Sequence, residues 1–282
     1  MALARNTVQQ TLCIPLWCRA RATETHPSFF PDSDAARIFA ELGAEPPKGF
    51  LYRLEYPSLQ TAIRQYDMAC ELADYVRRGH PRAAIVELGA GLSCLRRQIA
   101  RYGLPGAGNP WYAVDLPDVI ELREGLIPDD GTERRISCDL NDFSWMDAVD
   151  FNPADGVVFF AAGLFYYFRP CEVEALVAAM AERFPGGALA FDATSARGIR
   201  GVNHEVKQAG NETRSYFSLE DPVKEVAAWS PRIAHVHERD YWYGYAEPRY
   251  MPRMSLLTRG ISRHMRRMHL GFIVHADFAD AL

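Results

Sequence analysis

The segment from Ile85 to Gly91 constrains the fold of this chain more than any other part of its sequence. It begins as an apolar strand, runs into the turn Gly89-Ala90-Gly91, and is followed by a helical pattern over residues 92–102. Glycine lets the backbone turn sharply and approach a bound molecule, because no Cβ stands in the way. The segment therefore predicts the strand, turn and helix that open a ligand-binding α/β sheet.

Short apolar runs alternate with helical patterns from about residue 57 onward. Such alternation is typical of a parallel sheet with helices on both faces. We therefore predict the α/β class with a Rossmann-like sheet. The helices predicted between its strands cover residues 92–102, 117–125 and 170–184, and the predicted strands cover residues 83–88, 111–114, 135–138, 156–160, 188–191 and 270–276.

Two further helical patterns, at residues 33–42 and 59–78, precede the sheet. With 48% of its side chains apolar, the chain of 282 residues can bury one large core. We predict one structural unit with an N-terminal helical cap over residues 1–80 and a sheet domain over residues 81–282. The periodicity weakens at about residues 195–230, after the fifth strand. We expect this insertion to shape a substrate pocket, and an irregular surface excursion is the alternative.

The formal net charge of -5 at pH 7 is the sum of mixed signs along the chain. One basic cluster stands out near the C-terminus, and it is typical of a solvated helix face rather than of a nucleic-acid surface. The cluster consists of Arg259, Arg263, His264, Arg266 and Arg267. We therefore expect no nucleic-acid partner.

The six cysteines contain no Cys-x-x-Cys pair, so the sequence indicates neither a zinc site nor a disulfide framework. No other group of histidines, cysteines or carboxylates has metal-ligand spacing, and no metal is predicted. We expect free thiols in the reducing cytoplasm. Residues 1–20 contain no run of about 18 apolar residues, so we expect neither a signal peptide nor a membrane anchor.

Carboxylates follow two further strands of the predicted sheet. Asp115 ends the second strand, where it can accept hydrogen bonds from both hydroxyls of a ribose. Asp139 follows the third strand and can accept from an adenine amino group, while Leu140 packs on the ring. Taken singly, each aspartate could instead be a helix cap or a loop residue. Cys94 stands where a dinucleotide fingerprint has its third glycine, so the pattern favours a nucleoside without a pyrophosphate over NAD or FAD.

Six segments in this order resemble the leucine carboxyl methyltransferase superfamily, and most closely its tetracenomycin polyketide O-methyltransferase-like branch. The resemblance spans about residues 11–193, and the segments are residues 14–20, 62–67, 87–97, 114–117, 139–145 and 163–168. It implies a class I methyltransferase fold with S-adenosyl-L-methionine as cofactor. It also implies an O-methyltransferase whose acceptor is a small organic molecule, with a carboxylate or phenol of a polyketide-like or other secondary metabolite as the expected group.

The resemblance assigns roles to individual residues of the cofactor site. Arg64 would bind the carboxylate of the methionine portion, a bidentate task for which a guanidinium is suited. The carbonyl of Gly89 would receive the methionine amino group. Asp115 would hold the ribose, and Asp139 with Leu140 would hold the adenine.

The predicted cofactor site extends to four more residues, which are Glu87, Gly91, Leu116 and Ala162. The chain departs from the family's usual sequence at two positions of this site. An acidic residue commonly stands where this chain has Ala162, and Asp-Thr-Arg commonly stands where it has Ser93-Cys94-Leu95. The backbone groups remain available to a cofactor at both points.

The acceptor side of the site is less defined by the sequence. Methyl transfer from a sulfonium is an in-line displacement that needs no metal, so positioning is the main contribution of the protein. A carboxylate acceptor is already ionised near neutrality, whereas a phenol or alcohol would benefit from a general base. The candidates for positioning the acceptor, or for a base in the case of the histidine, are Arg19, Tyr166, Tyr167, Arg197 and His204.

Two other classes of function stay open at this point. An NAD-dependent oxidoreductase would share the strand, turn and helix and the ribose aspartate. A catalytically inactive homologue would bind the cofactor without transferring its methyl group, and Ala162 motivates that alternative. The sequence also leaves open the identity of the acceptor and the oligomeric state.

Overall fold

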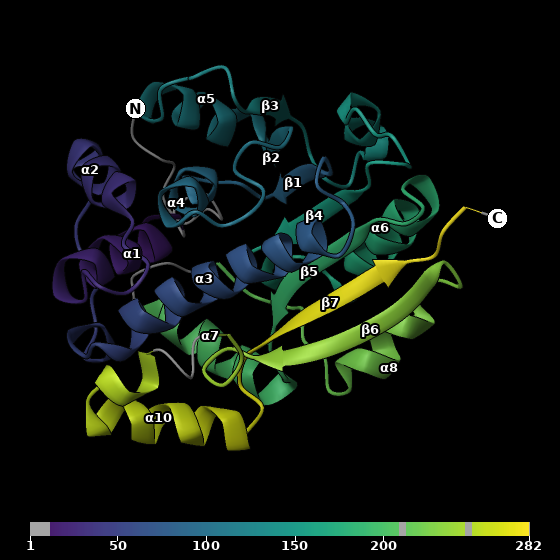
Figure 1. Ribbon diagram of the computed structural model, residues 1–282. Helices are drawn as coiled ribbons and strands as arrows, with labels where there is room; N and C mark the ends of the chain where they lie inside the picture. Colours follow the sequence, from purple (N-terminus) through teal and green to yellow (C-terminus); the bar gives the residue numbers. More distant parts are fainter. Residues whose placement is uncertain (1–11, 209–212, 246–249, 282) are drawn as a thin grey trace.

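The computed structural model describes residues 12–208, 213–245 and 250–281, and its strands form a seven-stranded sheet (Figure 1). The strand order is β3-β2-β1-β4-β5-β7-β6. β7 runs antiparallel to β5 and β6, and the other neighbouring strands are parallel. The strands are β1 (Ala84–Leu88), β2 (Trp111–Asp115), β3 (Arg134–Ser137), β4 (Val157–Ala161), β5 (Ala188–Ala193), β6 (Ile233–Asp240) and β7 (Phe272–Phe278). The predicted α/β class with a Rossmann-like sheet is confirmed.

Helices cover both faces of the sheet. Successive residues of a strand point to opposite faces, so a strand made of apolar residues has an apolar surface on each side for helices to pack on. In β4, Phe159 belongs to the core under one face and Phe160 to the core under the other, and both are fully buried. The first core is closed by η3 (Phe143–Ala148), α6 (Pro170–Arg183) and α8 (Pro222–Ala228), and the second by α3 (Tyr56–Arg77) and α4 (Leu95–Tyr102).

Two N-terminal helices, α1 (Cys13–Thr25) and α2 (Ser33–Leu42), lie beyond the carboxyl ends of the parallel strands (Figure 1). Leu16 of α1 and Ile38 of α2 form a third, smaller core with residues of α5 (Pro117–Leu126). α3 packs directly on the sheet. α3 belongs to the predicted cap but shares a core with the sheet, so this packing does not separate the two parts. The division into a cap and a sheet domain at residue 80 stays a prediction.

Every strand and helix that was predicted by residue range is present. Their observed ends differ from the predicted ends by three residues or fewer. The predicted insertion contains α7 (Ala196–Gln208) and α8. The basic cluster lies on α10 (Leu256–Arg267), where four of its five side chains are exposed, as expected of a solvated helix face. The remaining short helices are η2 (Leu51–Arg53), η4 (Phe165–Tyr167) and η5 (Met251–Arg253). Within the described residues, no helix has both the length and the apolarity needed to span a membrane.

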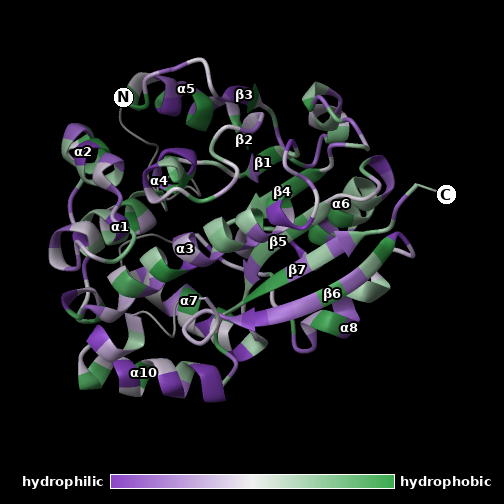
Figure 2. Ribbon diagram, in the orientation of Figure 1, coloured by the Kyte–Doolittle hydropathy of each residue, from purple (hydrophilic) through white to green (hydrophobic). Residues whose placement is uncertain are grey.

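Helix α1 and strand β6 were not predicted from the sequence. β6 is an edge strand whose residues alternate weakly in polarity, and it includes His235, His237 and Arg239. Figure 2 shows that β6 is largely hydrophilic. An edge strand pairs on one side only and can keep polar side chains in contact with water, so it lacks the apolar pattern of the central strands.

Phe159 offers a test of the core around β4. Its ring lies against the rings of Trp145, Phe184 and Phe278, with centroids 6.1, 4.9 and 6.5 Å away. Phe159→Ala should lower the free energy of unfolding by about 3–5 kcal/mol, because it removes buried apolar area and leaves a cavity. Urea unfolding measures the change, with Phe50→Ala as the control, since Phe50 is 72% exposed. A loss below about 1 kcal/mol for Phe159→Ala would contradict this packing.

Candidate active site

A cavity of about 240 Å³ lies at the carboxyl ends of β1, β2 and β4. Segments far apart in the chain supply its walls: α1, the start of α3, the strand ends, the segment after β4, and α7. The lining residues are Leu12, Ile14, Pro15, Cys18, Tyr52, Pro57, Gln60, Thr61, Arg64, Gly89, Asp115, Leu116, Val119, Ala162, Gly163, Leu164, Tyr166, Tyr167, Val202 and Tyr241. Seven predicted site residues from different parts of the sequence thus border one space. They are Arg64, Gly89, Asp115, Leu116, Ala162, Tyr166 and Tyr167.

The glycine turn after β1 forms the floor of this cavity. Gly89 and Gly91 have φ angles of +62° and +49°, a region that side chains with a Cβ rarely adopt. A Cβ on Gly89 would lie 2.5 Å from Leu164 Cδ1, and one on Gly91 would lie 2.9 Å from Leu12 Cδ2. Both positions therefore require glycine, as the sequence pattern indicates.

Two buried arginines hold the carbonyl groups of this turn. Arg123 donates hydrogen bonds to the carbonyls of Gly91 and Ser93 at 3.0 and 2.7 Å. Arg19 donates to the carbonyl of Leu92 at 3.0 Å and pairs with Asp32 at 2.9 Å. Arg19 does not line the cavity, so its predicted place beside the acceptor is not supported by this geometry. Its contacts instead tie α1 to the turn.

Asp115 connects the end of β2 to the same turn. Its Oδ2 accepts a hydrogen bond from the backbone N–H of Gly91 at 2.7 Å, and its Oδ1 accepts from that of Leu116 at 2.8 Å. Burial raises the pKa of this carboxyl, and the two backbone hydrogen bonds act in the opposite direction. Each carboxylate oxygen can accept more than one hydrogen bond, so Asp115 keeps capacity for a ligand hydroxyl.

Arg64, which also lines the cavity, is held by Asp192 at the end of β5. Arg64 Nη1 lies 3.1 Å from Asp192 Oδ2, and the carboxylate also accepts from Tyr241 Oη at 2.9 Å and from Gly163 N at 2.5 Å. Burial lowers the pKa of Arg64, but the charge and hydrogen bond of Asp192, together with Tyr241 and Tyr166, raise it overall. The guanidinium therefore stays charged beside the cavity.

Asp192 and Tyr241 were not predicted as site residues from the sequence. Asp192 directly follows the predicted strand of residues 188–191, so the pattern of carboxylates at strand ends could have revealed it. Tyr241 follows β6, the strand that the polarity pattern did not show. Asp192 is 1% exposed and Tyr241 is 3% exposed, so both serve the site from within the protein.

The predicted acceptor residues divide into two groups. Tyr166 and Tyr167 line the cavity, and burial raises the pKa of Tyr166 well above its usual value. Arg197 and His204 are exposed on α7 and do not line it. Val202 of α7 does line the cavity.

The predicted adenine pair lies outside the cavity lining. Asp139 is exposed, and its Oδ1 accepts hydrogen bonds from Asn141 N at 2.9 Å and Asn141 Nδ2 at 3.1 Å. Leu140 is 5% exposed and packs in the core of the sheet. Their role toward adenine therefore stays a prediction.

Glu87 of β1 lies behind the glycine turn and is 4% exposed. Its Oε2 has no hydrogen-bond partner among the described residues. Burial raises the pKa of Glu87 to about 7, although the charge of Arg123 lowers it in part. The side chain is thus poised to change protonation near neutral pH.

The raised pKa of Glu87 predicts a dependence of stability on pH. Between pH 4.5 and about 7, the folded chain keeps this proton while the unfolded chain has lost it. As the pH rises through this window, the free energy of unfolding of the wild type should therefore fall relative to that of Glu87→Gln. Urea unfolding across the window measures it, with the exposed Glu124→Gln as control. Parallel curves for the wild type and Glu87→Gln would contradict the shifted pKa.

The chain is similar to known methyltransferases over parts of its length. The leucine carboxyl methyltransferase family matches residues 56–181. The "Tetracenomycin polyketide synthesis O-methyltransferase TcmP" of Streptomyces glaucescens is 35% identical over 114 residues, and the matched segment spans 40% of each protein. The "S-adenosyl-L-methionine-dependent methyltransferase dpfgK" of Gibberella zeae is 25% identical over 257 residues, 84% of each.

The fold is also shared with a solved structure. Geranyl diphosphate C-methyltransferase of Streptomyces coelicolor A3(2) superimposes with a TM-score of 0.51 at 14% identity, covering 99% of this chain and 100% of that one. At this identity the likeness concerns the fold alone. Together with the strand order, it confirms the predicted class I methyltransferase sheet.

Proposed function

We propose that the chain is an S-adenosylmethionine-dependent methyltransferase that methylates an oxygen of a small organic acceptor, because residues 56–181 match the leucine carboxyl methyltransferase family. The observation that carries the proposal is the cavity itself. It brings Asp115, Gly89 and Arg64 around one space, and these groups are suited to a ribose, an amino group and a carboxylate.

The residues of this cavity fit the cofactor. Gly89 lines the cavity, and its carbonyl would receive the methionine amino group. Arg64 Nε has no hydrogen-bond partner among the described residues, which leaves the guanidinium a donor for the methionine carboxylate. Asp115 would accept the ribose hydroxyls. The bound cofactor would supply an electrophilic methyl group on its sulfonium.

The lining of the cavity favours a carboxylate acceptor. No histidine is among the described lining residues. Burial raises the pKa values of Tyr166 and Tyr241, so neither phenol is suited to accept a proton at neutral pH. A carboxylate needs no base, because it is ionised before it binds. Tyr52 and Tyr167 add aromatic surface, which suits an acceptor with flat rings, such as a polyketide-like metabolite.

Substitution of Asp115 tests the cofactor site. Asp115→Ala should weaken binding of S-adenosylhomocysteine by about 1–3 kcal/mol, because the ribose hydroxyls would lose a charged acceptor. Titration calorimetry measures the change. Asp118→Ala is the matched control, since Asp118 is exposed three residues further along and does not line the cavity. Unchanged affinity in Asp115→Ala, or equally tight binding of NAD to the wild type, would overturn the assignment.

The product and the pH dependence of the rate test the acceptor. With a carboxylate acceptor, the rate should be nearly flat between about pH 6 and 8, well above the acceptor's own pKa. A labelled methyl ester should then release methanol in mild alkali. An alkali-stable product with a rate that rises with pH would instead indicate a phenol. A methyl group on nitrogen, sulfur or carbon would contradict O-methylation, and cofactor binding without turnover on any acceptor would support the inactive homologue.

A further inference from the structure

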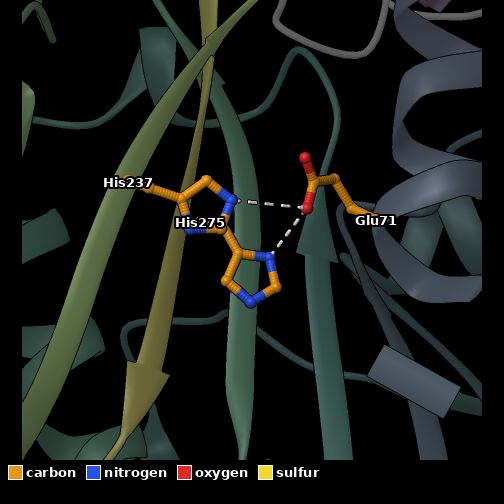
Figure 3. Close-up of side chains that lie close together, drawn as sticks. All are labelled: Glu71, His237 and His275. Carbon is orange, nitrogen blue, oxygen red and sulfur yellow. Dashed lines mark hydrogen bonds and ion pairs between the residues drawn. The ribbon is translucent and has the colours of Figure 1, made fainter. Parts of the chain in front are cut away.

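Three side chains from distant parts of the sequence converge between α3 and the β6–β7 edge of the sheet (Figure 3). Glu71 belongs to α3, and His237 and His275 are paired residues of β6 and β7. Glu71 Oε2 lies 2.9 Å from His275 Nδ1 and 3.9 Å from His237 Nε2. One ligand atom of each residue lies within 4.8 Å of the other two, so the three atoms surround a common point.

The groups behind these side chains are arranged as the groups behind metal ligands commonly are. His275 Nε2 lies 3.1 Å from Asp277 Oδ1, so the carboxylate can accept the ring proton and leave a lone pair on Nδ1. Glu71 Oε1 accepts a hydrogen bond from Arg239 Nε at 2.9 Å, which leaves Oε2 toward the histidines. Arg78, which also approaches His275, pairs with Asp277 at 3.2 Å. Each arginine thus pairs with a carboxylate, and each also lies near a histidine Nε2: Arg239 Nη2 is 3.4 Å from that of His237, and Arg78 Nη2 is 3.1 Å from that of His275. Arg239 would have to turn away from His237 when the ion binds.

We propose that Glu71, His237 and His275 bind a divalent transition-metal ion, with zinc as the ion that suits this ligand set best. Zinc takes imidazole nitrogens and carboxylate oxygens at about 2.0–2.2 Å, and in a tetrahedron such atoms lie about 3.3–3.5 Å apart. The observed separations of 2.9 and 3.9 Å lie on either side of that value. The three ligand atoms all lie within 4.8 Å of one another, so rotation of the side chains would have to bring them to the tetrahedral spacing when the ion binds.

His237 gives the site its opening to solvent. Its side chain is 31% exposed, whereas those of Glu71 and His275 are 2% and 1% exposed. An ion can enter past His237, and water can take the fourth ligand position. The two buried ligands are held in place by the packing of α3 on the sheet, which limits the ordering cost of binding.

The proposed role of the metal is structural. None of the three ligands lines the cavity. Glu71 lies two helical turns after Arg64 on α3, so an ion that fixes Glu71 against β6 and β7 also fixes the helix that presents the guanidinium. The inference does not rest on the proposed methyl transfer, and failure of either leaves the other standing.

A cobalt titration of the full chain tests the site. Protein stripped with a chelator is titrated with Co²⁺, whose visible absorption reports its ligands, and Zn²⁺ is then added in competition. His237→Ala removes one ligand from a partly exposed position where the fold should tolerate the change. His264→Ala is the matched control, because His264 is exposed on α10. Circular dichroism establishes that each variant is folded.

The wild type and His264→Ala should bind one Co²⁺ per chain, displaced by Zn²⁺. His237→Ala should bind about tenfold more weakly or worse, since even losing a group that only orients a ligand costs about 10- to 100-fold. Asp277→Asn should show that smaller loss. Equal binding by the wild type and His237→Ala, no binding by either, or a spectrum of thiolate ligands from the cysteines would overturn the proposal. The three side chains would then form a hydrogen-bonded ion-pair network only.

Discussion

The buried carboxylate of Asp192 fixes the relative positions of the parts that the site depends on. From the end of β5 it accepts hydrogen bonds from the segment after β4, from Tyr241 after β6, and from Arg64 of α3. A buried charge that loses its partner costs about 3–5 kcal/mol, so the arrangement is stable only when these parts are in place together. The position of Arg64 beside the cavity thus follows from the sheet and not from α3 alone.

At the glycine turn, some side chains hold the backbone in place, while another also faces the cavity where a ligand would bind. Arg19 and Arg123 occupy its carbonyls from outside, while Asp115 bonds to its N–H from the cavity side. Glycine adopts the left-handed backbone of Gly89 and Gly91 readily, and the contacts on both sides select it from the other conformations open to glycine. An arginine near a ligand site can therefore be occupied by other parts of the protein, as Arg19 is by the Leu92 carbonyl and by Asp32.

The sequence allowed prediction of those parts whose cause is local. The turn at Gly89 follows from a backbone requirement that only glycine meets, and Asp115 follows from its place at a strand end. Strand β6 was missed because edge position lets polar residues occupy it. The group of Glu71 and His275 depends on how α3 packs across β7, and no spacing along the chain encodes that contact.

The place of β7 in the sheet has a consequence for how the chain folds during synthesis. β7 lies between β5 and β6, although it follows both in sequence, so β6 can join the sheet only through β7. Until residues 272–278 leave the ribosome, β5 keeps an unpaired edge and the backbone groups of Ile233–Asp240 have no partner strand. Open edges of this kind pair readily with other chains. The nascent protein is therefore most exposed to aggregation just before its last strand emerges.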